Sequence, residues 1–212
     1  MKRFFFILIM GITIAQLFVL NSEEKTISVY IDPGHGGLDG GAVGIDGTHE
    51  DEIALSISLM LRGYFEEIGI NTYLTRDGDY DLANQNYNRK REDIHKRVEL
   101  INDSNATLFI SIHLNSIPSS KWSGAQTFYY GDNNKSLAVK IQKSLEDKLS
   151  TNRKAKAISR VYLLKNVEKI GVLVEVGFLS NYKELTLLKT VEYQDEIANA
   201  IYLGVLNYLS DL

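Results

Sequence analysis

Residues able to do chemistry gather in a turn that follows an alternating apolar segment at residues 27–31. Residues 31–37 read Ile-Asp-Pro-Gly-His-Gly-Gly, in which Pro33 cannot extend a sheet and the glycines adopt backbone conformations that other residues resist. The turn therefore projects the imidazole of His35 from the carboxyl end of a strand, where open α/β sheets bind their ligands. Alone, the run is equally compatible with an ordinary Gly-rich turn.

A second imidazole lies on the predicted strand 108–115. Ser111, His113 and Asn115 share one face near its carboxyl end, whereas the alternate residues are aliphatic. This face needs partners, because an unpaired buried polar group costs about 1–3 kcal/mol. A single strand histidine is more often structural than a ligand, but the neighbouring Asn115 favours a site.

A carboxylate, Glu175, stands in the middle of the apolar run 172–178. Buried there, it must be neutral, paired or next to a cation. One interpretation is a buried salt bridge with Lys165, Lys169 or Arg160. We favour an active-site role, because perturbed carboxylates concentrate in active sites.

Three acidic residues, Glu50, Asp51 and Glu52, begin a predicted helix. Acidic side chains in a first turn also simply favour the helix dipole, and Thr48 can cap the helix. Spacing does not decide which of the three faces a site, and the adjacent His49 is easily mistaken for a ligand.

Two basic runs, residues 89–97 and 153–156, are most simply solvated faces, and His95 is expected on the solvated side of its helix. The aromatic residues within 122–130 either border a sugar groove or belong to the core.

The elements that position these residues alternate between strand and helix from Thr26 onward. Strands are expected at residues 27–31, 71–76, 108–115, 124–130, 161–164 and 170–178, and helices at 53–68, 94–101, 137–149 and 197–209. No repeat, low-complexity linker or second domain interrupts residues 26–212. We therefore predict a single α/β domain with a twisted, largely parallel sheet and helices on both faces.

Composition narrows the chemistry further. The 212 residues suit one domain with a proper core, and the 44% hydrophobic content excludes wholesale disorder. A formal charge of −4 argues against nucleic acid as a partner. The chain has no cysteine, so any metal must be held by His, Asp or Glu.

The N-terminal residues 1–25 are expected to be a signal peptide or membrane anchor. Lys2 and Arg3 precede a nearly uninterrupted apolar run at residues 4–20, about 25 Å long as a helix. We favour an uncleaved anchor, because the apolar run continues past the small residues at 13–15. The positive flank then stays inside and the domain faces outward.

Taken together, four motifs resemble one family, the zinc-dependent N-acetylmuramoyl-L-alanine amidases of bacterial cell walls, over a stretch from Val29 to Leu209. The motifs are residues 32–37 (DPGHGG), 47–50 (GTHE), 111–115 (SIHLN) and 174–181 (VEVGFLSN). The resemblance implies a zinc ion held by His35, Glu50 and His113, with Glu175 as the catalytic glutamate that moves the proton of the attacking water. It also selects Glu50 over its acidic neighbours.

Within this family, the chain most resembles the germination-specific branch found in spore formers. The resemblance rests on residues 122–130, 152–156 and 161–165. That branch removes stem peptides from cortex peptidoglycan, a step towards muramic δ-lactam. The chain departs from the usual pattern at Asn181-Tyr182 and at residues 169–171, where proline is common. The likeness implies a peptidoglycan substrate and action in the forespore cortex. The apolar run at residues 4–20 predicts attachment at the outer face of the membrane, which raises the effective concentration of the domain at the insoluble wall, and a membrane-associated protein partner is expected to assist.

Two alternatives stay open. One is a zinc peptidase on a related fold, and the other is an inactive wall-binding or regulatory module. Loss of His35, His113 or Glu175 would have favoured the inactive module, and all three are present.

Overall fold

Six strands form one sheet in the order β2-β1-β3-β6-β4-β5 in the computed structural model, which describes residues 26–84, 87–149 and 151–212. The predicted signal or anchor segment lies outside the described residues. The strands are β1 (Ser28–Pro33), β2 (Asn71–Leu74), β3 (Leu108–Asn115), β4 (Gln126–Tyr129), β5 (Lys156–Ala157) and β6 (Ile170–Phe178). The helices are α2 (Glu50–Glu67), α3 (Arg89–Asp103), α4 (Lys135–Lys148), α5 (Tyr162–Asn166), α6 (Tyr182–Leu188) and α7 (Val191–Leu209), with a 3-10 turn η1 (Asp132–Asn134).

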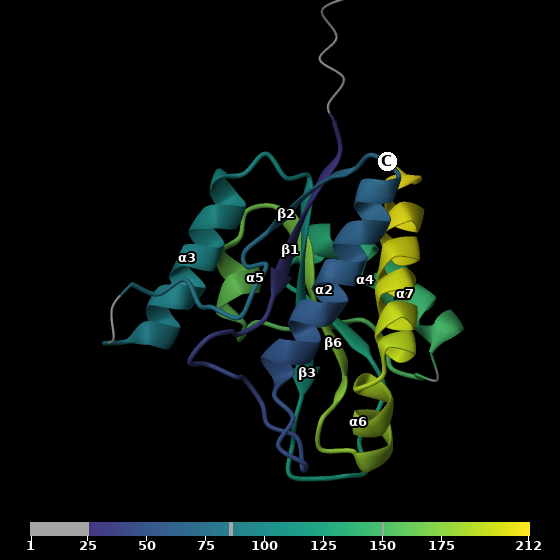
Figure 1. Cartoon of the computed structure of the whole chain (residues 1–212). Helices are drawn as coiled ribbons and strands as arrows, with labels where there is room; N and C mark the ends of the chain where they lie inside the picture. The colour runs from purple at the N-terminus through teal and green to yellow at the C-terminus, as the bar shows by residue number, and fades with distance from the viewer. Residues whose placement is uncertain (1–25, 85–86, 150) are drawn as a thin grey trace, which may run out of the picture.

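Neighbouring strands run parallel everywhere except at the β4–β6 pair, which is antiparallel. The predicted largely parallel α/β sheet is therefore confirmed. Strand β3 lies between β1 and β6, so the carboxyl ends of these three strands meet at one edge of the sheet, at the bottom of Figure 1. Both Ser28, where β1 begins, and the end of α7 lie at the opposite edge (Figure 1).

Helices cover both faces of the sheet, with α2, α4 and α7 on one side and α3 and α5 on the other (Figure 1). On β3, Ile110 and Ile112 face the α2 side, whereas Phe109 packs with α3 and α5. A strand buried on both faces in this way reads as a nearly continuous apolar run.

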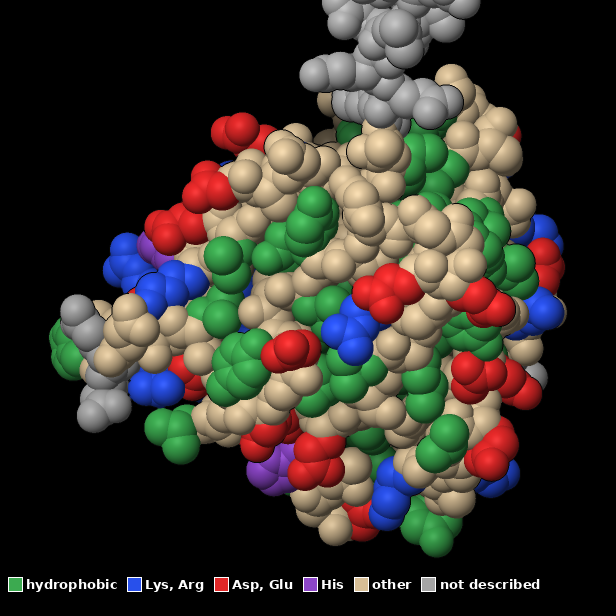
Figure 2. All heavy atoms as spheres, turned by 45° about the horizontal axis from the view of Figure 1, so that its top comes forward, with side chains coloured by type: hydrophobic (Ala, Val, Ile, Leu, Met, Phe, Trp, Pro, Cys, Tyr) green, Lys and Arg blue, Asp and Glu red, His purple; other side chains and the backbone are tan. Residues whose placement is uncertain are grey.

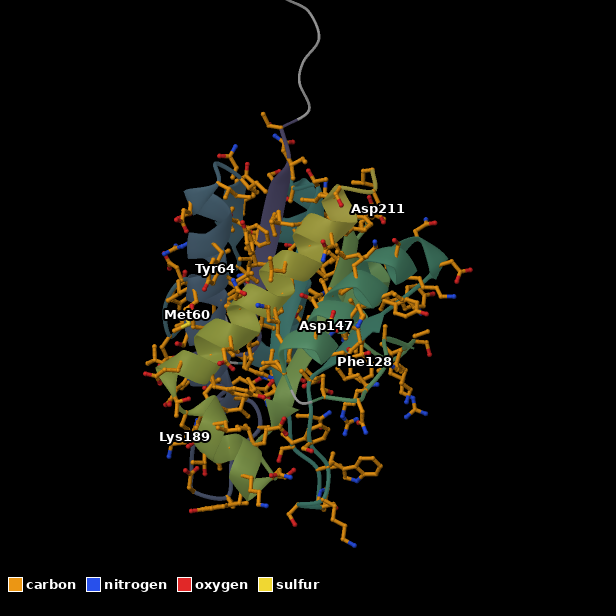
Figure 3. All side chains as sticks on the ribbon, turned by 90° about the vertical axis from the view of Figure 1, so that its right-hand side faces the viewer. Met60, Tyr64, Phe128, Asp147, Lys189 and Asp211 are labelled. Carbon is orange, nitrogen blue, oxygen red and sulfur yellow. The ribbon has the colours of Figure 1, made fainter. Side chains whose placement is uncertain are left out.

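Helix α7 crosses α2, as the side view in Figure 3 shows. Tyr64 of α2 stacks on Tyr202 with ring centroids 5.3 Å apart, and its hydroxyl lies 2.9 Å from Asp195 Oδ1. Acidic and basic side chains are interspersed over the face drawn in Figure 2, in keeping with the small net charge.

One expected strand is wrong, and one helix was missed. Residues 161–164 form no strand, because Tyr162–Asn166 is the short helix α5, which buries Leu163 and Leu164 beneath α3. Periodicity alone cannot distinguish a short apolar run in a strand from one in a helix. Helix α6 was not predicted, although Asn181 caps it by accepting hydrogen bonds from the backbone of Lys183 and Glu184.

Candidate active site

The loop after β1 brings His35 to the edge of the sheet. His35 itself adopts a left-handed backbone conformation (φ 60°). The preceding Gly34 donates a backbone hydrogen bond to Ile112 of β3, with N···O 2.9 Å. A Cβ atom on Gly34 would lie 2.4 Å from Cε1 of His113, so only glycine fits against this imidazole.

Two buried arginines hold the backbone of this loop. Arg97 of α3 donates to the carbonyl oxygens of Pro33 (2.6 Å) and His35, and Arg76 donates to those of Pro33 (3.1 Å) and Gly34 (2.8 Å). The prediction that residues 89–97 form a solvated face is wrong for Arg97, which is only 2% exposed. Sequence reasoning missed both arginines. Nothing in the run 89–97 marks which member turns inward, and nothing around Arg76 indicates its distant partners.

Asp32 is the counter-charge of Arg97. Its Oδ1 lies 2.8 Å from Arg97 Nη1 and 2.7 Å from Thr75 Oγ1, and its Oδ2 accepts from Ser111 Oγ at 2.6 Å. Burial alone would raise the pKa of Asp32. The charge of Arg97 and the two hydrogen bonds from hydroxyl groups outweigh this effect, so the pKa is lower than the usual 3.8. The polar position at Ser111, noted in the sequence, thus serves this ion pair.

His35, Glu50 and His113 come together as a group able to hold a metal ion, with one ligand atom from each and all of these within 4.8 Å of one another. Glu50 Oε1 lies 2.9 Å from His113 Nδ1, and Glu50 Oε2 lies 3.3 Å from His35 Nε2. Two imidazoles and one carboxylate are a donor set typical of catalytic zinc sites.

Glu50 is fixed by the backbone as well as by the imidazoles. Its two oxygens accept hydrogen bonds from the backbone N–H groups of Leu114 (2.9 Å) and Ala42 (2.8 Å). Burial alone would raise the pKa of Glu50. Hydrogen bonds from His113 and His35 outweigh this effect, so the pKa is well below the usual 4.5. Glu50 therefore stays ionised.

The neighbours of Glu50 do not enter this group. The residue that caps α2 is His49 rather than Thr48, and no side-chain hydrogen bond caps the helix. Glu52 is exposed, and His95, expected on the solvated side of α3, is half-buried and stacks on Tyr162 with ring centroids 4.8 Å apart.

The outward nitrogen of His35 has its own carboxylate partner. Asp39 Oδ2 lies 3.0 Å from His35 Nδ1, which leaves Nε2 directed at Glu50. Lys90 Nζ of α3 lies 2.8 Å from Asp39 Oδ1. Carboxylates in this position fix the orientation of metal-binding imidazoles. The sequence offered only one signal for Asp39, its spacing of four residues from His35.

Glu175 pairs in register with His113 across β6 and β3, so the two side chains project from the same face of the sheet. Within the described part of the chain, its Oε2 is buried without a hydrogen-bond partner, and the suggested ion pairs with Lys165, Lys169 and Arg160 are absent. Burial raises the pKa of Glu175 to about 7. A carboxylate of this kind can both accept and release a proton near neutral pH.

Comparisons with known proteins cover most of the chain. The model of the family described as N-acetylmuramoyl-L-alanine amidase matches residues 29–207. The germination-specific N-acetylmuramoyl-L-alanine amidase of Bacillus subtilis (strain 168) is 50% identical over 190 residues, which cover 86% of this chain and 80% of that protein.

Solved structures show the same fold. The CwlD amidase of Clostridioides difficile, determined in complex with the GerS lipoprotein, superposes with a TM-score of 0.85 at 42% identity and covers 88% of this chain and all of that one (100%). AmiC2 of Nostoc punctiforme gives a TM-score of 0.78 at 32% identity, with 87% and 98% of the two chains covered.

Proposed function

Because this chain belongs to the family of N-acetylmuramoyl-L-alanine amidases, we propose that it is a zinc hydrolase acting on spore peptidoglycan. The bond cut joins the lactyl group of N-acetylmuramic acid to L-alanine, the first residue of the stem peptide. One observation carries the assignment of roles: Glu175, whose buried Oε2 has no hydrogen-bond partner among the described residues, stands in register beside His113 of the metal-binding group.

His35, Glu50 and His113 would hold the zinc ion. The donor set suits zinc, and three protein ligands are the usual number at a catalytic site, where a further position is kept for water or substrate. A bound zinc supplies Lewis-acid chemistry, polarising the scissile carbonyl and acidifying water. The fixed environment of Glu50 supports its role as ligand, because it keeps the carboxylate ionised and oriented.

Glu175 is the proton shuttle. It takes a proton from the attacking water as general base and gives it to the departing amine of L-alanine as general acid. A pKa raised to about 7 by burial suits both halves of this task. No covalent intermediate is needed, since water attacks the carbonyl directly.

The cortex of spores is the proposed place of action. The B. subtilis relative is named germination-specific and is 50% identical to this chain. Removal of the stem peptide exposes the lactyl carboxyl group of muramic acid, and this is the step required before a muramic δ-lactam can form.

Delivery to the wall rests on the N-terminal segment. None of the helices within the described residues is long and apolar enough to cross a membrane. We assign anchoring, without cleavage, to residues 1–25, with the catalytic domain at 26–212 outside. Since β1 begins at the edge of the sheet opposite the site, a tethered domain turns its site away from the membrane (Figure 1). The C. difficile relative was solved with a lipoprotein, and a membrane-associated protein partner is proposed here too.

Digestion of purified cortex peptidoglycan by the full chain tests this function. We expect mass spectrometry to show new free lactyl groups on muramic acid and new N-terminal L-alanine. The variant His113→Ala should lose most of its zinc, which we expect at about one ion per chain in the wild type, together with this activity. Cleavage of peptides that lack muramic acid, at a comparable rate, would instead favour a zinc peptidase.

A further inference from the structure

Arg153 is a fixed cation that the mechanism above leaves unused. The sequence predicted a solvated face for residues 153–156, yet this guanidinium is half-buried, 4.6 Å from the ring centroid of Phe178 and 5.5 Å from that of Trp122. Its Nε donates to the carbonyl oxygen of Ser123 at 2.7 Å, and its Nη1 donates to Gln126 Oε1 at 3.1 Å. Aromatic faces and these two acceptors hold it in one place.

Strand register places this guanidinium beside the shuttle carboxylate. Gln126 of β4 is the antiparallel partner of Glu175 on β6, so their side chains share a face. An extra residue in β6, between its pairings with His113 and Asn115, turns Phe178 onto that face as well. Across the sheet the order is thus metal-binding imidazole, Glu175, Gln126 and then the guanidinium.

No described carboxylate forms an ion pair with Arg153. The nearby Glu184 is buried, and its oxygens accept hydrogen bonds from the backbone N–H groups of Gly124 (2.8 Å) and Phe178 (2.9 Å). Nη2 of Arg153 has no hydrogen-bond partner among the described residues, whereas Gln126 is held by its own bond to the carbonyl of Lys154 (2.9 Å). A guanidinium with a free donor edge matches the planar geometry of a carboxylate.

The direction of proton transfer indicates which part of the substrate meets this cation. Glu175 gives its proton to the amine of L-alanine, so the departing peptide lies on the Glu175 side of the metal-binding group. Arg153 lies further along that same row. We propose that Arg153 binds the first free carboxylate that the stem peptide carries beyond L-alanine, and that Gln126 positions it. This inference rests on the proposed amidase function.

The test compares two muropeptides that differ only at the carboxyl group of the second stem residue, which is free in one and amidated in the other. For the zinc-loaded full chain we expect kcat/KM to be about 10-fold higher on the free carboxylate, mainly through KM, as for a charge-assisted hydrogen bond. Arg153→Gln should remove this preference while zinc content stays at the wild-type level. Arg160→Gln, at an exposed arginine, is the matched control and should keep the preference.

Equal kcat/KM on the two muropeptides by the wild type would overturn the inference, while cleavage of both would leave the amidase function standing. Cleavage of neither would overturn the amidase function and the inference with it. If Arg153 had only a structural role, the substitution Arg153→Gln would lower the rates on both substrates equally. That result would also count against the inference. If that variant does not fold, Arg153→Lys replaces it. A preference for the free carboxylate as strong in Arg153→Lys as in the wild type would contradict a role for the guanidinium group.

Discussion

Two carboxylates of the site, Glu50 and Glu175, lie in opposite surroundings. Glu50 accepts hydrogen bonds from two backbone N–H groups and faces two imidazoles, so its charge is fixed. Glu175 has a buried oxygen with no partner in the described part of the chain, and burial raises its pKa to about 7. This difference supports the proposed division of roles, in which Glu50 holds the metal ion and Glu175 exchanges a proton.

The contrast extends to the regions that carry them. Around the β1–α2 loop, Arg97 and Arg76 bind backbone carbonyl oxygens and Asp39 orients His35, so hydrogen bonds and ion pairs fix the geometry of these groups. Around β6, the acidic group stands on an apolar, largely buried strand, and its Oε2 has no hydrogen-bond partner among the described residues.

Replacing Arg97 should produce the largest loss of stability. Arg97→Met leaves Asp32 buried and without its counter-charge, and we expect the free energy of unfolding to fall by about 3–5 kcal/mol. Denaturant unfolding of the full chain measures the change. Arg91→Met, at an exposed position on the same helix, is the control and should stay within about 0.5 kcal/mol of the wild type. A loss below about 1 kcal/mol for Arg97→Met would show that the pair does not hold the loop.

Acid should weaken the same region through Asp32. Because the pKa of Asp32 is lower in the folded protein than its usual 3.8, the unfolded chain binds more protons as the pH falls, and the stabilisation present above pH 4 is lost below it. We expect Asp32→Asn to melt at a lower temperature than the wild type at pH 7, and the gap to narrow as the pH drops below about 4. Thermal melts across pH give the comparison, and a gap independent of pH would contradict it.

Asp39 should matter for metal binding and little for folding. Asp39→Asn removes the charge that orients His35, and we expect zinc affinity to fall by about 10-fold to 100-fold. Competition with a chelator measures the dissociation constant. Asp46→Asn, an exposed change in the same loop, serves as control, and equal zinc affinities in the two variants would refute the role of Asp39.

Lys90 should contribute least. Its side chain is 77% exposed although it pairs with Asp39, and exposed pairs are worth little. We expect Lys90→Met to change zinc affinity by less than about fivefold, with the difference shrinking at high salt. A change as large as that of Asp39→Asn would mean that the ammonium group, and not the carboxylate, orients the imidazole.

Much of this architecture is predictable from local patterns. Alternation of apolar segments predicts the parallel sheet, and glycines around His35 predict the turn that the structure places at its edge. Contacts between residues far apart in the sequence cannot be predicted from local patterns. Which arginine of residues 89–97 turns inward depends on the position of Asp32, 65 residues from Arg97 in sequence, and no local periodicity encodes that distance. The same holds for Arg153, whose aromatic and amide partners come from β6 and from the chain near β4.

Paired measurements of zinc content and hydrolysis on Glu50→Gln and Glu175→Gln test the contrast most directly. We expect Glu50→Gln to lose most of its zinc and its activity together. Glu175→Gln should keep about one zinc per chain while release of L-alanine-terminated peptides from peptidoglycan falls by roughly 10²-fold or more. Full zinc content in Glu50→Gln, or near wild-type hydrolysis by Glu175→Gln, would contradict the division of roles between the two carboxylates.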